Sequence, residues 1–169
     1  MKSSEESRFL LRIKLPRLPT LAEMATEVKD VPIFAGVDPS TLDLLAREAR
    51  EVRVGKGDRI VKEGEPGNTF YLVLEGSVRV CKRLGTVEEV ELSRLGPGEF
   101  FGEMCILETL PRSASVQAVS KTMLLALSSV TFYHVFQKNP AEYCILLLNI
   151  ARDLSRRLRR LDEVFPGRH

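Results

Sequence analysis

The central part of the chain alternates between apolar and polar residues with a period of two, which is the pattern of half-buried β-strands. Frequent glycines interrupt this pattern and mark turns between the strands. Many short strands separated by turns indicate a closed β-roll or sandwich of about 75 residues. The alternating positions are Val52/Val54, Phe70/Leu72/Leu74, Val78/Val80, Val90/Leu92 and Leu125/Leu127.

Two of these strands are expected to form a hairpin. They run from Phe70 to Leu74 and from Val78 to Lys82, and the short connection Glu75-Gly76-Ser77 joins them. A connection of this length with a central glycine favours a tight turn between antiparallel partners.

Helical periodicity replaces the strand pattern on both sides of this region. Before it, apolar residues recur at helical spacing from Thr20 to Arg50, and Asp38-Pro39-Ser40 supplies a capping side chain and a proline at a helix start. After it, a short helix is expected to stop near Asn139-Pro140, and a longer one to run from about Ala141 to Val164. The predicted order is therefore helix, β-roll, helix.

The chain is expected to hold one domain with an N-terminal extension. Residues 1–20 form the predicted arm, because two prolines close to its end prevent a helix from continuing through it. We interpret the arm as a solvated extension, although its apolar and basic residues would also suit docking on the domain or on a neighbour. Residues 21–169 form the domain, with the β-roll at about 51–128 and the C-terminal helices at about 129–164.

Composition narrows the function classes. The 169 residues carry Lys+Arg 25 against Asp+Glu 23, and the resulting net charge of +2 gives no overall field for wrapping nucleic acid. Two histidines and three widely spaced cysteines are a poor basis for a metal centre or a disulfide framework, and the thiols suit a reducing cytoplasm. No apolar run is long enough for a membrane span or a signal peptide. We therefore expect a cytoplasmic protein without a catalytic metal.

The stretch from Phe100 to Ala114 breaks the strand rhythm, after a Gly-Pro-Gly turn, and carries the candidate chemistry. Gly102 allows a ligand to approach the backbone closely, and residues 103–107 fit a single helical turn whose first N–H groups have no partner inside the helix. Such a terminus attracts an anion, and Arg112 adds a planar fork that matches two phosphate oxygens. Ser113 offers a hydroxyl and a backbone N–H beside that arginine.

Glu103 makes the predicted ligand more specific, because a carboxylate beside a bound anion repels it unless the carboxylate meets a neutral donor. A ribose 2′-hydroxyl is such a donor. An acid for a sugar hydroxyl and an arginine for one negative charge, without histidine or metal, fit a nucleotide monophosphate that is bound and not hydrolysed. We therefore expect a binding protein and not an enzyme. The plain alternative is an ordinary turn at Gly102-Glu103, with Arg112 in a surface ion pair.

Two long stretches carry signatures in a fixed order along the chain. The first, Ile60 to Gly76, holds an apolar pair, a Gly-acid turn and a four-residue apolar strand that ends in Gly. The second runs from Phe101-Gly102-Glu103 through Arg112-Ser113-Ala114-Ser115-Val116. Both resemble the cyclic nucleotide-binding domain family of the bacterial catabolite activator, the protein kinase A regulatory subunit and cyclic nucleotide-gated channels, where the second stretch is the phosphate-binding cassette. With the flanking helices, the resemblance covers about Val31 to Val164.

The resemblance implies a mainly β fold with flanking helices: an antiparallel double-stranded β-helix, or jelly-roll-like β-roll, with N-terminal helices and a C-terminal helical lid. It implies that Glu103 takes the ribose 2′-hydroxyl and that Arg112 pairs with the cyclic phosphate. Backbone groups at Gly102, Cys105 and Ser113 are implied to complete the cradle. The expected ligand-binding residues are Gly102, Glu103, Met104, Cys105, Arg112, Ser113 and Ala114.

Two cassette positions bear on the choice of ligand. Cys105 stands where the family usually has Gly, Ala or Ser, and its bulkier thiol would tighten or fill the pocket near the phosphate. Ser113 follows the arginine as in the bacterial activator, and it does not supply the threonine often linked with cGMP preference. The expected ligand is therefore cAMP, with cGMP less favoured. The alternatives are another small anion, or an unoccupied cassette in an interaction module of the same fold.

The other two cysteines, Cys81 and Cys144, are interpreted as buried, small apolar side chains.

The long C-terminal helix is the predicted route by which a ligand signal leaves the domain, since family behaviour implies that ligand capture closes this helix over the base. An a/d seam of nearly three heptads runs along it, which suits a homodimer or another protein partner, and equally suits packing on its own β-roll. The seam residues are Leu147, Leu154 and Leu161, interleaved with Ala151, Leu158 and Phe165. Five arginines on the helix are expected to be solvated: Arg152, Arg156, Arg157, Arg159 and Arg160.

Direct DNA binding is not expected, because the segment Phe165 to His169 that follows the helix is too short for a helix-turn-helix reader. The chain is expected to be a sensor without the usual output domain, or the ligand-sensing piece of a larger transcription regulator, kinase or channel system. The group that covers the base is left open, with Phe165, Tyr143 or a residue of the arm as candidates.

Overall fold

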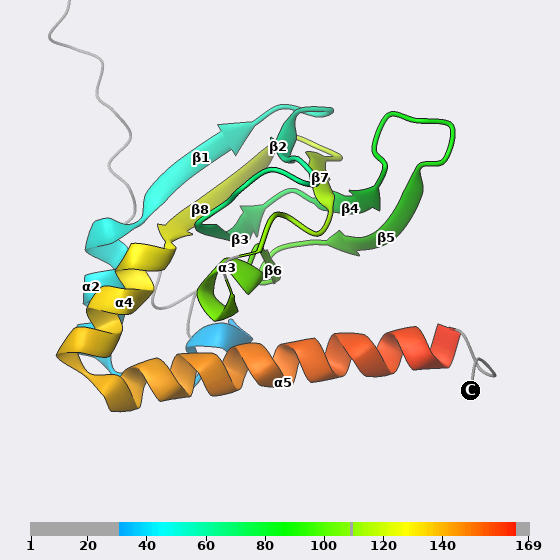
Figure 1. Ribbon diagram of the computed structural model, residues 1–169. Helices are drawn as coiled ribbons and strands as arrows, with labels where there is room; N and C mark the ends of the chain where they lie inside the picture. The colour runs from blue at the N-terminus through cyan, green and yellow to red at the C-terminus, as the bar shows by residue number, and fades with distance from the viewer. Residues whose placement is uncertain (1–30, 109, 165–169) are drawn as a thin grey trace, which may run out of the picture.

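Eight strands and five helical segments make up the part of the chain described by the computed structural model, which covers residues 31–108 and 110–164 (Figure 1). The predicted arm, residues 1–20, lies outside these ranges. The elements in chain order are η2 (Pro32–Phe34), α2 (Pro39–Glu48), β1 (Arg50–Val54), β2 (Arg59–Val61), β3 (Thr69–Glu75), β4 (Val78–Lys82), β5 (Val90–Leu95), β6 (Phe100–Phe101), α3 (Met104–Leu107), β7 (Ser115–Ala118), β8 (Thr122–Ser128), α4 (Ser129–Lys138) and α5 (Pro140–Val164).

The strands form two antiparallel four-stranded sheets, in the orders β1-β8-β3-β6 and β2-β7-β4-β5. The two sheets make up the roll, and the helices gather on one side of it, with α5 running along the whole length of that side (Figure 1). This arrangement confirms the mainly β fold with flanking helices. It also sets β6 and α3 between the roll and α5.

The hairpin predicted between residues 70–74 and 78–82 is wrong. β3 pairs with β6 and β8, whereas β4 pairs with β5 and β7, so these consecutive strands lie in different sheets. The chain crosses from one sheet to the other at Gly76, whose φ is +80°. The amide of Ser77 donates to the hydroxyl oxygen of Ser120 at 3.1 Å, which ties the crossing to the connection between β7 and β8. The central glycine therefore serves a crossing between layers, which local sequence does not distinguish from a tight turn.

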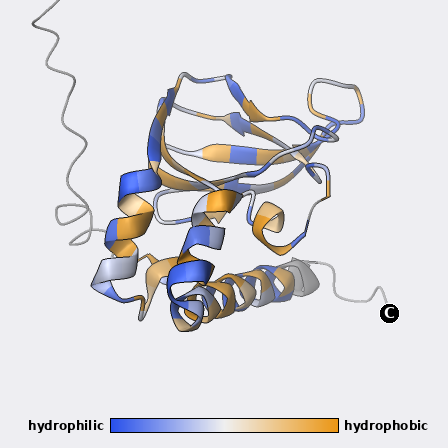
Figure 2. Ribbon diagram, turned by 60° about the vertical axis from the view of Figure 1, so that its left-hand side comes forward, coloured by the Kyte–Doolittle hydropathy of each residue, from blue (hydrophilic) through white to orange (hydrophobic). Residues whose placement is uncertain are grey.

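Two apolar clusters form the core, one on each face of the first sheet, because successive residues of a strand point to opposite faces. The strands β3 and β8 of this sheet are therefore apolar at consecutive positions. Figure 2 shows hydrophobic stretches, in orange, on the strands and on the helices below them. The cluster between the two sheets consists of Val61, Val73, Val78, Leu95, Phe101, Val116 and Leu124. The second cluster lies between the sheet and the helices, where the ring of Phe70 is 5.2 Å from that of Phe100 and 5.6 Å from that of Phe132. The strand β6 thus contributes adjacent phenylalanines to both clusters.

Capping and buried polar groups fix the start of α2 and the contact between α5 and η2. The carboxylate of Asp38 accepts a hydrogen bond from the amide of Ser40 at 2.7 Å, and Pro39 occupies the first turn of α2, as the sequence predicts. On α5, the buried side-chain amide of Asn149 donates to the carbonyl oxygens of Ile33 at 3.0 Å and Ala35 at 2.8 Å. These two bonds attach the middle of α5 to η2.

None of the helices within residues 31–108 and 110–164 combines the length and apolar composition that a membrane span requires. Over the same ranges, no group of three His, Cys, Asp or Glu side chains is placed to hold a metal ion.

Candidate functional site

The cassette begins where β6 ends and the chain turns at Gly102. This residue has a φ of +79°, in the left-handed region that favours glycine. A Cβ at this position would lie 2.7 Å from Nη1 of Arg112 and 2.7 Å from the carbonyl oxygen of Thr69, closer than packed atoms allow. The turn leads directly into α3, which has Glu103 at its N-cap. Glycine at position 102 therefore lets the glutamate and the arginine approach the same point of the backbone.

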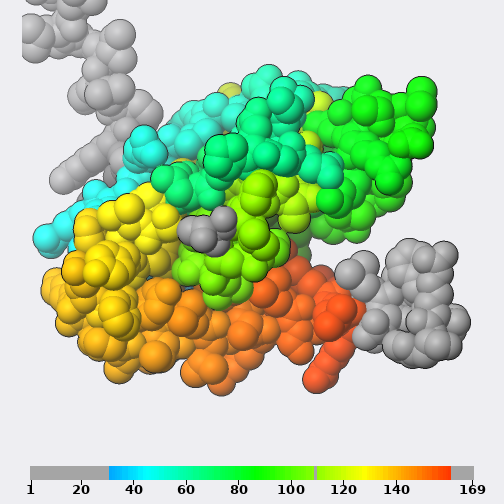
Figure 3. Space-filling model, viewed as in Figure 1, coloured from blue at the N-terminus to red at the C-terminus, as the bar shows by residue number. Residues whose placement is uncertain are grey.

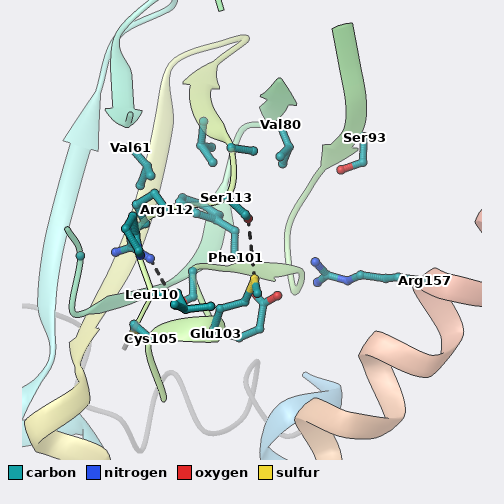
Figure 4. A pocket seen from close by; sticks show the side chains of 16 residues that line it. Val61, Val80, Ser93, Phe101, Glu103, Cys105, Leu110, Arg112, Ser113 and Arg157 are labelled. Atoms are coloured by element: carbon teal, nitrogen blue, oxygen red, sulfur yellow. Dashed lines mark hydrogen bonds between the residues drawn. The ribbon is translucent and has the colours of Figure 1, made fainter. Parts of the chain in front are cut away.

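A pocket of about 130 Å³ lies beside this turn, between the roll, α3 and α5 (Figure 4). The seven residues that the sequence predicts as ligand-binding all line it: Gly102, Glu103, Met104, Cys105, Arg112, Ser113 and Ala114. The other lining residues are Val61, Gly67, Val80, Ser93, Phe101, Leu110, Pro111, Val116 and Arg157. The cassette therefore forms one wall of the pocket, and strands, the loop before β3 and α5 supply the rest.

Glu103 is buried, with 8% of its surface exposed, and it lines the pocket. Among residues 31–108 and 110–164, its carboxylate has neither a hydrogen-bond donor nor an ion-pair partner. Burying a carboxylate without a donor costs free energy, so a ligand that brings a hydroxyl to this position would be stabilised there. The carboxylate is therefore available to a ligand in the pocket.

Arg112 forms no ion pair with an acidic side chain in the described part of the chain. Its guanidinium donates to two backbone carbonyl oxygens, from Nη2 to Thr69 at 2.6 Å and from Nη1 to Gly102 at 3.3 Å. Two of its five N–H donors are thus used by neutral acceptors, which hold the group in place without cancelling its charge. The site therefore combines a fixed positive charge with an unpaired carboxylate.

The loop that carries the first signature contacts Arg112 through its backbone and through Gly67. The amide of Arg112 donates to the carbonyl oxygen of Glu65, and the amide of Gly64 donates to the carbonyl oxygen of Arg112, both at 2.9 Å. The α-carbon of Gly67 packs so closely against the guanidinium that a Cβ there would overlap its Nε. The loop before β3 therefore positions the arginine, which explains in physical terms why the two signatures occur together. Sequence analysis placed no function on Gly67, although its place in the first signature was a signal.

The remaining cassette residues are partly engaged with one another. The amide of Cys105 donates to the carbonyl oxygen of Gly102 at 3.3 Å, inside the turn, so the predicted backbone contribution of Cys105 is already used there. Burial raises the pKa of the Cys105 thiol above its usual value, and the nearby Arg112 opposes this shift. The exposed Ser113 donates from its hydroxyl to the sulfur of Met104 at 3.7 Å, a contact drawn in Figure 4.

Arg157 is a pocket residue that sequence analysis did not find, because it was expected to be solvated with the other arginines of α5. Its Nη2 donates to the carbonyl oxygen of Phe100 at 2.7 Å, and its guanidinium carbon lies 4.8 Å from the centroid of the Phe100 ring. Its Nε forms an ion pair with Asp153, one turn earlier on the helix, at 2.6 Å. The contacts with Phe100 join residues far apart in the chain, so no local pattern could have indicated them. The ion pair with Asp153 has the i,i+4 spacing of a helix and does not by itself place Arg157 at the pocket.

The C-terminal helix uses only part of the predicted seam for its own domain. Leu154 packs on the core cluster and Leu147 is half-buried, whereas 60% of Leu158 is exposed. Ala151 is also exposed. The fully buried residues of this helix, Leu146 and Ile150, lie outside the predicted seam. The side chains of Leu161 and Phe165 lie outside the part that can be described, so their place in the seam stays a prediction.

The interpretation of Cys144 as buried is wrong, since it is exposed on α5, whereas Cys81 is buried as expected.

The molecule brings α3, α4 and α5 together on one face, where the cassette fills the space between the roll and the helix (Figure 3). Along the pocket, Arg112 and Arg157 lie on opposite sides, with Glu103 between them (Figure 4). Two positive groups and one acceptor suit a ligand that carries an anionic group and at least one hydroxyl. Burial of Cys105 disfavours the thiolate that a nucleophile would need. The arrangement is suited to holding such a ligand.

The sequence is similar to that of known proteins over most of the domain. The family described as cyclic nucleotide-binding domain matches residues 51–139. A cyclic AMP receptor protein of Thermus thermophilus is 36% identical over 135 residues, which cover 80% of this chain and 61% of that protein. A cyclic nucleotide-gated potassium channel of Mesorhizobium japonicum is 40% identical over 113 residues, covering 67% of this chain and 30% of the channel.

Solved structures show the same relationship. The crystal structure of the catabolite activator protein of Thermus thermophilus has a TM-score of 0.65 and 38% identity to this chain, covering 78% of this chain and 60% of that one. In all three of these comparisons the chain spans less than two thirds of the relative's own length.

Proposed function

Because the chain belongs to the family of cyclic nucleotide-binding domains, we propose that it is a non-catalytic cytoplasmic receptor for cAMP that passes its ligand state to a partner through α5. The observation that carries the proposal is that a buried carboxylate and a fixed positive charge line the same pocket. In the described part of the chain, Glu103 is a buried carboxylate without a donor, and the Arg112 guanidinium is held by two carbonyl oxygens and pairs with no acid. A cyclic nucleotide supplies the complement of both, a ribose 2′-hydroxyl and one negative phosphate.

In this proposal Glu103 accepts the hydrogen of the ribose 2′-hydroxyl. Arg112 neutralises the cyclic phosphate, while the hydroxyl and amide of Ser113 contribute donors at its edge. Each charge-assisted hydrogen bond of this kind stabilises the complex by about 1.5 to 3 kcal/mol. Gly102, Met104, Cys105 and Ala114 shape the wall of the pocket.

The preference for cAMP over cGMP rests on Ser113, which follows Arg112 as it does in the bacterial activator that the sequence resembles. One of the similar proteins is itself described as a cyclic AMP receptor protein, and its match covers 80% of this chain. Cytoplasmic location is proposed because three free cysteines, of which Cys144 is exposed, suit a reducing compartment.

The signal is proposed to leave through α5, because this helix contacts the pocket at Arg157 and also presents exposed apolar residues. Leu148 and Leu158 are 54% and 60% exposed, and both lie on the helix that Arg157 fastens to Phe100 of β6, next to the cassette. A homodimer or a separate protein partner that covers these residues would sense any shift of α5.

Calorimetric titration of the full chain with cAMP, cGMP and AMP tests the proposal. The chain should bind cAMP most tightly and AMP most weakly, since AMP lacks the ring-closed phosphodiester. Arg112→Ala should weaken cAMP binding about tenfold or more, because at least one charge-assisted bond is lost. Arg156→Ala removes an exposed arginine of α5 as the matched control and should leave affinity unchanged. Absence of heat or of a melting-temperature rise with any cyclic nucleotide, from a folded wild-type chain, would falsify the receptor proposal.

A further inference from the structure

A second cavity adjoins the cassette pocket at Arg112. Its volume is about 180 Å³, compared with about 130 Å³ for the cassette pocket. Val61, Gly67 and Arg112 line both cavities and therefore form a wall that the two share. The other polar residues of the second cavity come from β2, from β3 and from the loop between these strands: Lys62, Glu65, Asn68, Thr69 and Tyr71.

The guanidinium of Arg112 spans this shared wall. Nη1 donates at 3.3 Å to the carbonyl oxygen of Gly102, which of the two cavities lines only the cassette pocket. Nη2 donates at 2.6 Å to the carbonyl oxygen of Thr69, which lines only the second cavity. These carbonyl groups use two of the five N–H donors and leave three. One positive charge therefore serves both cavities, and it attracts an anion in either of them.

The charges around the second cavity favour an anion. The ammonium of Lys62 lies 3.1 Å from a carboxylate oxygen of Glu65, so these two half-exposed side chains offset each other. Arg112 forms no ion pair within residues 31–108 and 110–164, and its charge is left over. Ligand pockets for drug-sized molecules measure about 300 to 1,000 Å³. At about 180 Å³, the second cavity suits a smaller molecule.

Neutral hydrogen-bond donors line the same cavity. Oδ1 of Asn68 accepts the hydroxyl hydrogen of Thr69 at 3.1 Å, which leaves the amide hydrogens of Asn68 as donors. The partly buried ring of Tyr71 is stacked on that of Phe101, with centroids 5.0 Å apart, and this contact restricts the position of its hydroxyl. Within the described ranges, the Tyr71 hydroxyl has no hydrogen-bond partner. An amide, a hydroxyl and a guanidinium are the donors that a small oxyanion requires.

We propose that the second cavity binds a small oxyanion, a phosphate or a carboxylate, and that this anion lowers the affinity of the cassette for a cyclic nucleotide. Both ligands draw on the charge of Arg112, and they repel each other across the shared wall. The coupling is reciprocal, so a cyclic nucleotide weakens binding of the anion by the same factor. The effect on nucleotide affinity rests on the proposed function, whereas binding of the anion does not.

Calorimetric titration of the full chain with cAMP tests the coupling, in inorganic phosphate or in acetate, with chloride holding the ionic strength constant. The apparent Kd for cAMP should rise about fivefold or more with at least one anion, and level off once the second cavity is full. Simple competition at the cassette gives a rise that does not level off.

Two variants remove groups of the second cavity alone. Lys62→Ala leaves the carboxylate of Glu65 without its cation, so the rise should disappear. Tyr71→Phe keeps the ring and loses only the hydroxyl, and it should raise the anion concentration at half effect about fivefold. Both variants should bind cAMP in chloride as the wild type does. Lys56→Ala is the matched control, since this exposed lysine lines neither cavity.

The melting temperature gives a readout that needs no nucleotide, because an anion that binds the folded chain should raise it above its value in chloride, and less so in Lys62→Ala. Two outcomes overturn the inference and leave the proposed function intact. One is an anion effect of the same size in the wild type and both variants, which places the anion in the cassette. The other is no effect of phosphate or acetate on cAMP affinity or melting temperature. If the wild type binds no cyclic nucleotide while its anion response depends on Lys62, the anion site stands and the proposed function fails.

Discussion

Gly67 and Arg112 are 45 positions apart in the numbering of the chain and touch in the fold, where the bare α-carbon of the glycine leaves the space that the guanidinium fills. The same guanidinium reaches the carbonyl oxygens of Thr69 and Gly102. The position of this positive charge is thus a property of the loop before β3 as much as of the cassette.

Gly67→Ala is expected to displace Arg112 and weaken cyclic nucleotide binding about tenfold or more, because the added methyl group overlaps the guanidinium and at least one charge-assisted bond is lost. Gly96→Ala is the matched control, since a Cβ at that position meets no atom within 4 Å. Titration calorimetry on both variants measures the effect. Unchanged affinity in Gly67→Ala would show that Arg112 finds its position without this contact.

The three cysteines are expected to react with iodoacetamide in the order Cys144, Cys105, Cys81, following their exposure. Because burial raises the pKa of Cys105, less thiolate forms at a given pH. Its alkylation rate should therefore rise at a higher pH than that of a free thiol, whose pKa is about 8.5. Saturating cAMP should slow Cys105 and leave Cys144 unaffected. Peptide mass spectrometry over a pH series gives the rates, and equal protection of both cysteines would argue against ligand binding beside Cys105.

The two faces of α5 should respond differently to truncation. Ile150→Ala should lower the free energy of unfolding by about 2 to 5 kcal/mol, because the side chain is fully buried. Leu158→Ala should change it by no more than about 0.5 kcal/mol and instead alter self-association or partner binding. Leu154 is a less useful probe of the outer face, since it packs on the core cluster. Urea titration and sedimentation measure the two effects; a stability loss in Leu158→Ala as large as that in Ile150→Ala would contradict this division.

Asn149→Ala is expected to destabilise the domain by about 1 to 3 kcal/mol, because the carbonyl oxygens of Ile33 and Ala35 lose their donor in a buried position. Ser155→Ala, at an exposed position of the same helix, is the control. Thermal and urea unfolding measure the difference. A neutral result for Asn149→Ala would mean that η2 is held to α5 by apolar packing alone.

Much of the secondary structure could be predicted because its causes are local. The helix start at Asp38-Pro39 follows from one side chain and one ring, and the turn at Gly102 follows from a conformation that other residues avoid. The pairing of β3 could not be predicted in the same way, because a glycine-centred connection such as that at Gly76 suits both a hairpin and a crossing between sheets. Which of these occurs depends on the strands that lie alongside.

The roll, its flanking helices and the segment that forms the cassette follow from the sequence, since each depends on consecutive residues whose periodicity or conformational preference acts over a few positions. Folding was needed to show that Gly67 makes room for Arg112, that α5 has a buried and an exposed face, and that Arg157 lines the pocket. Those contacts arise from packing between distant segments. Their free energy depends on shape and distance after folding, which no pattern within a single segment records.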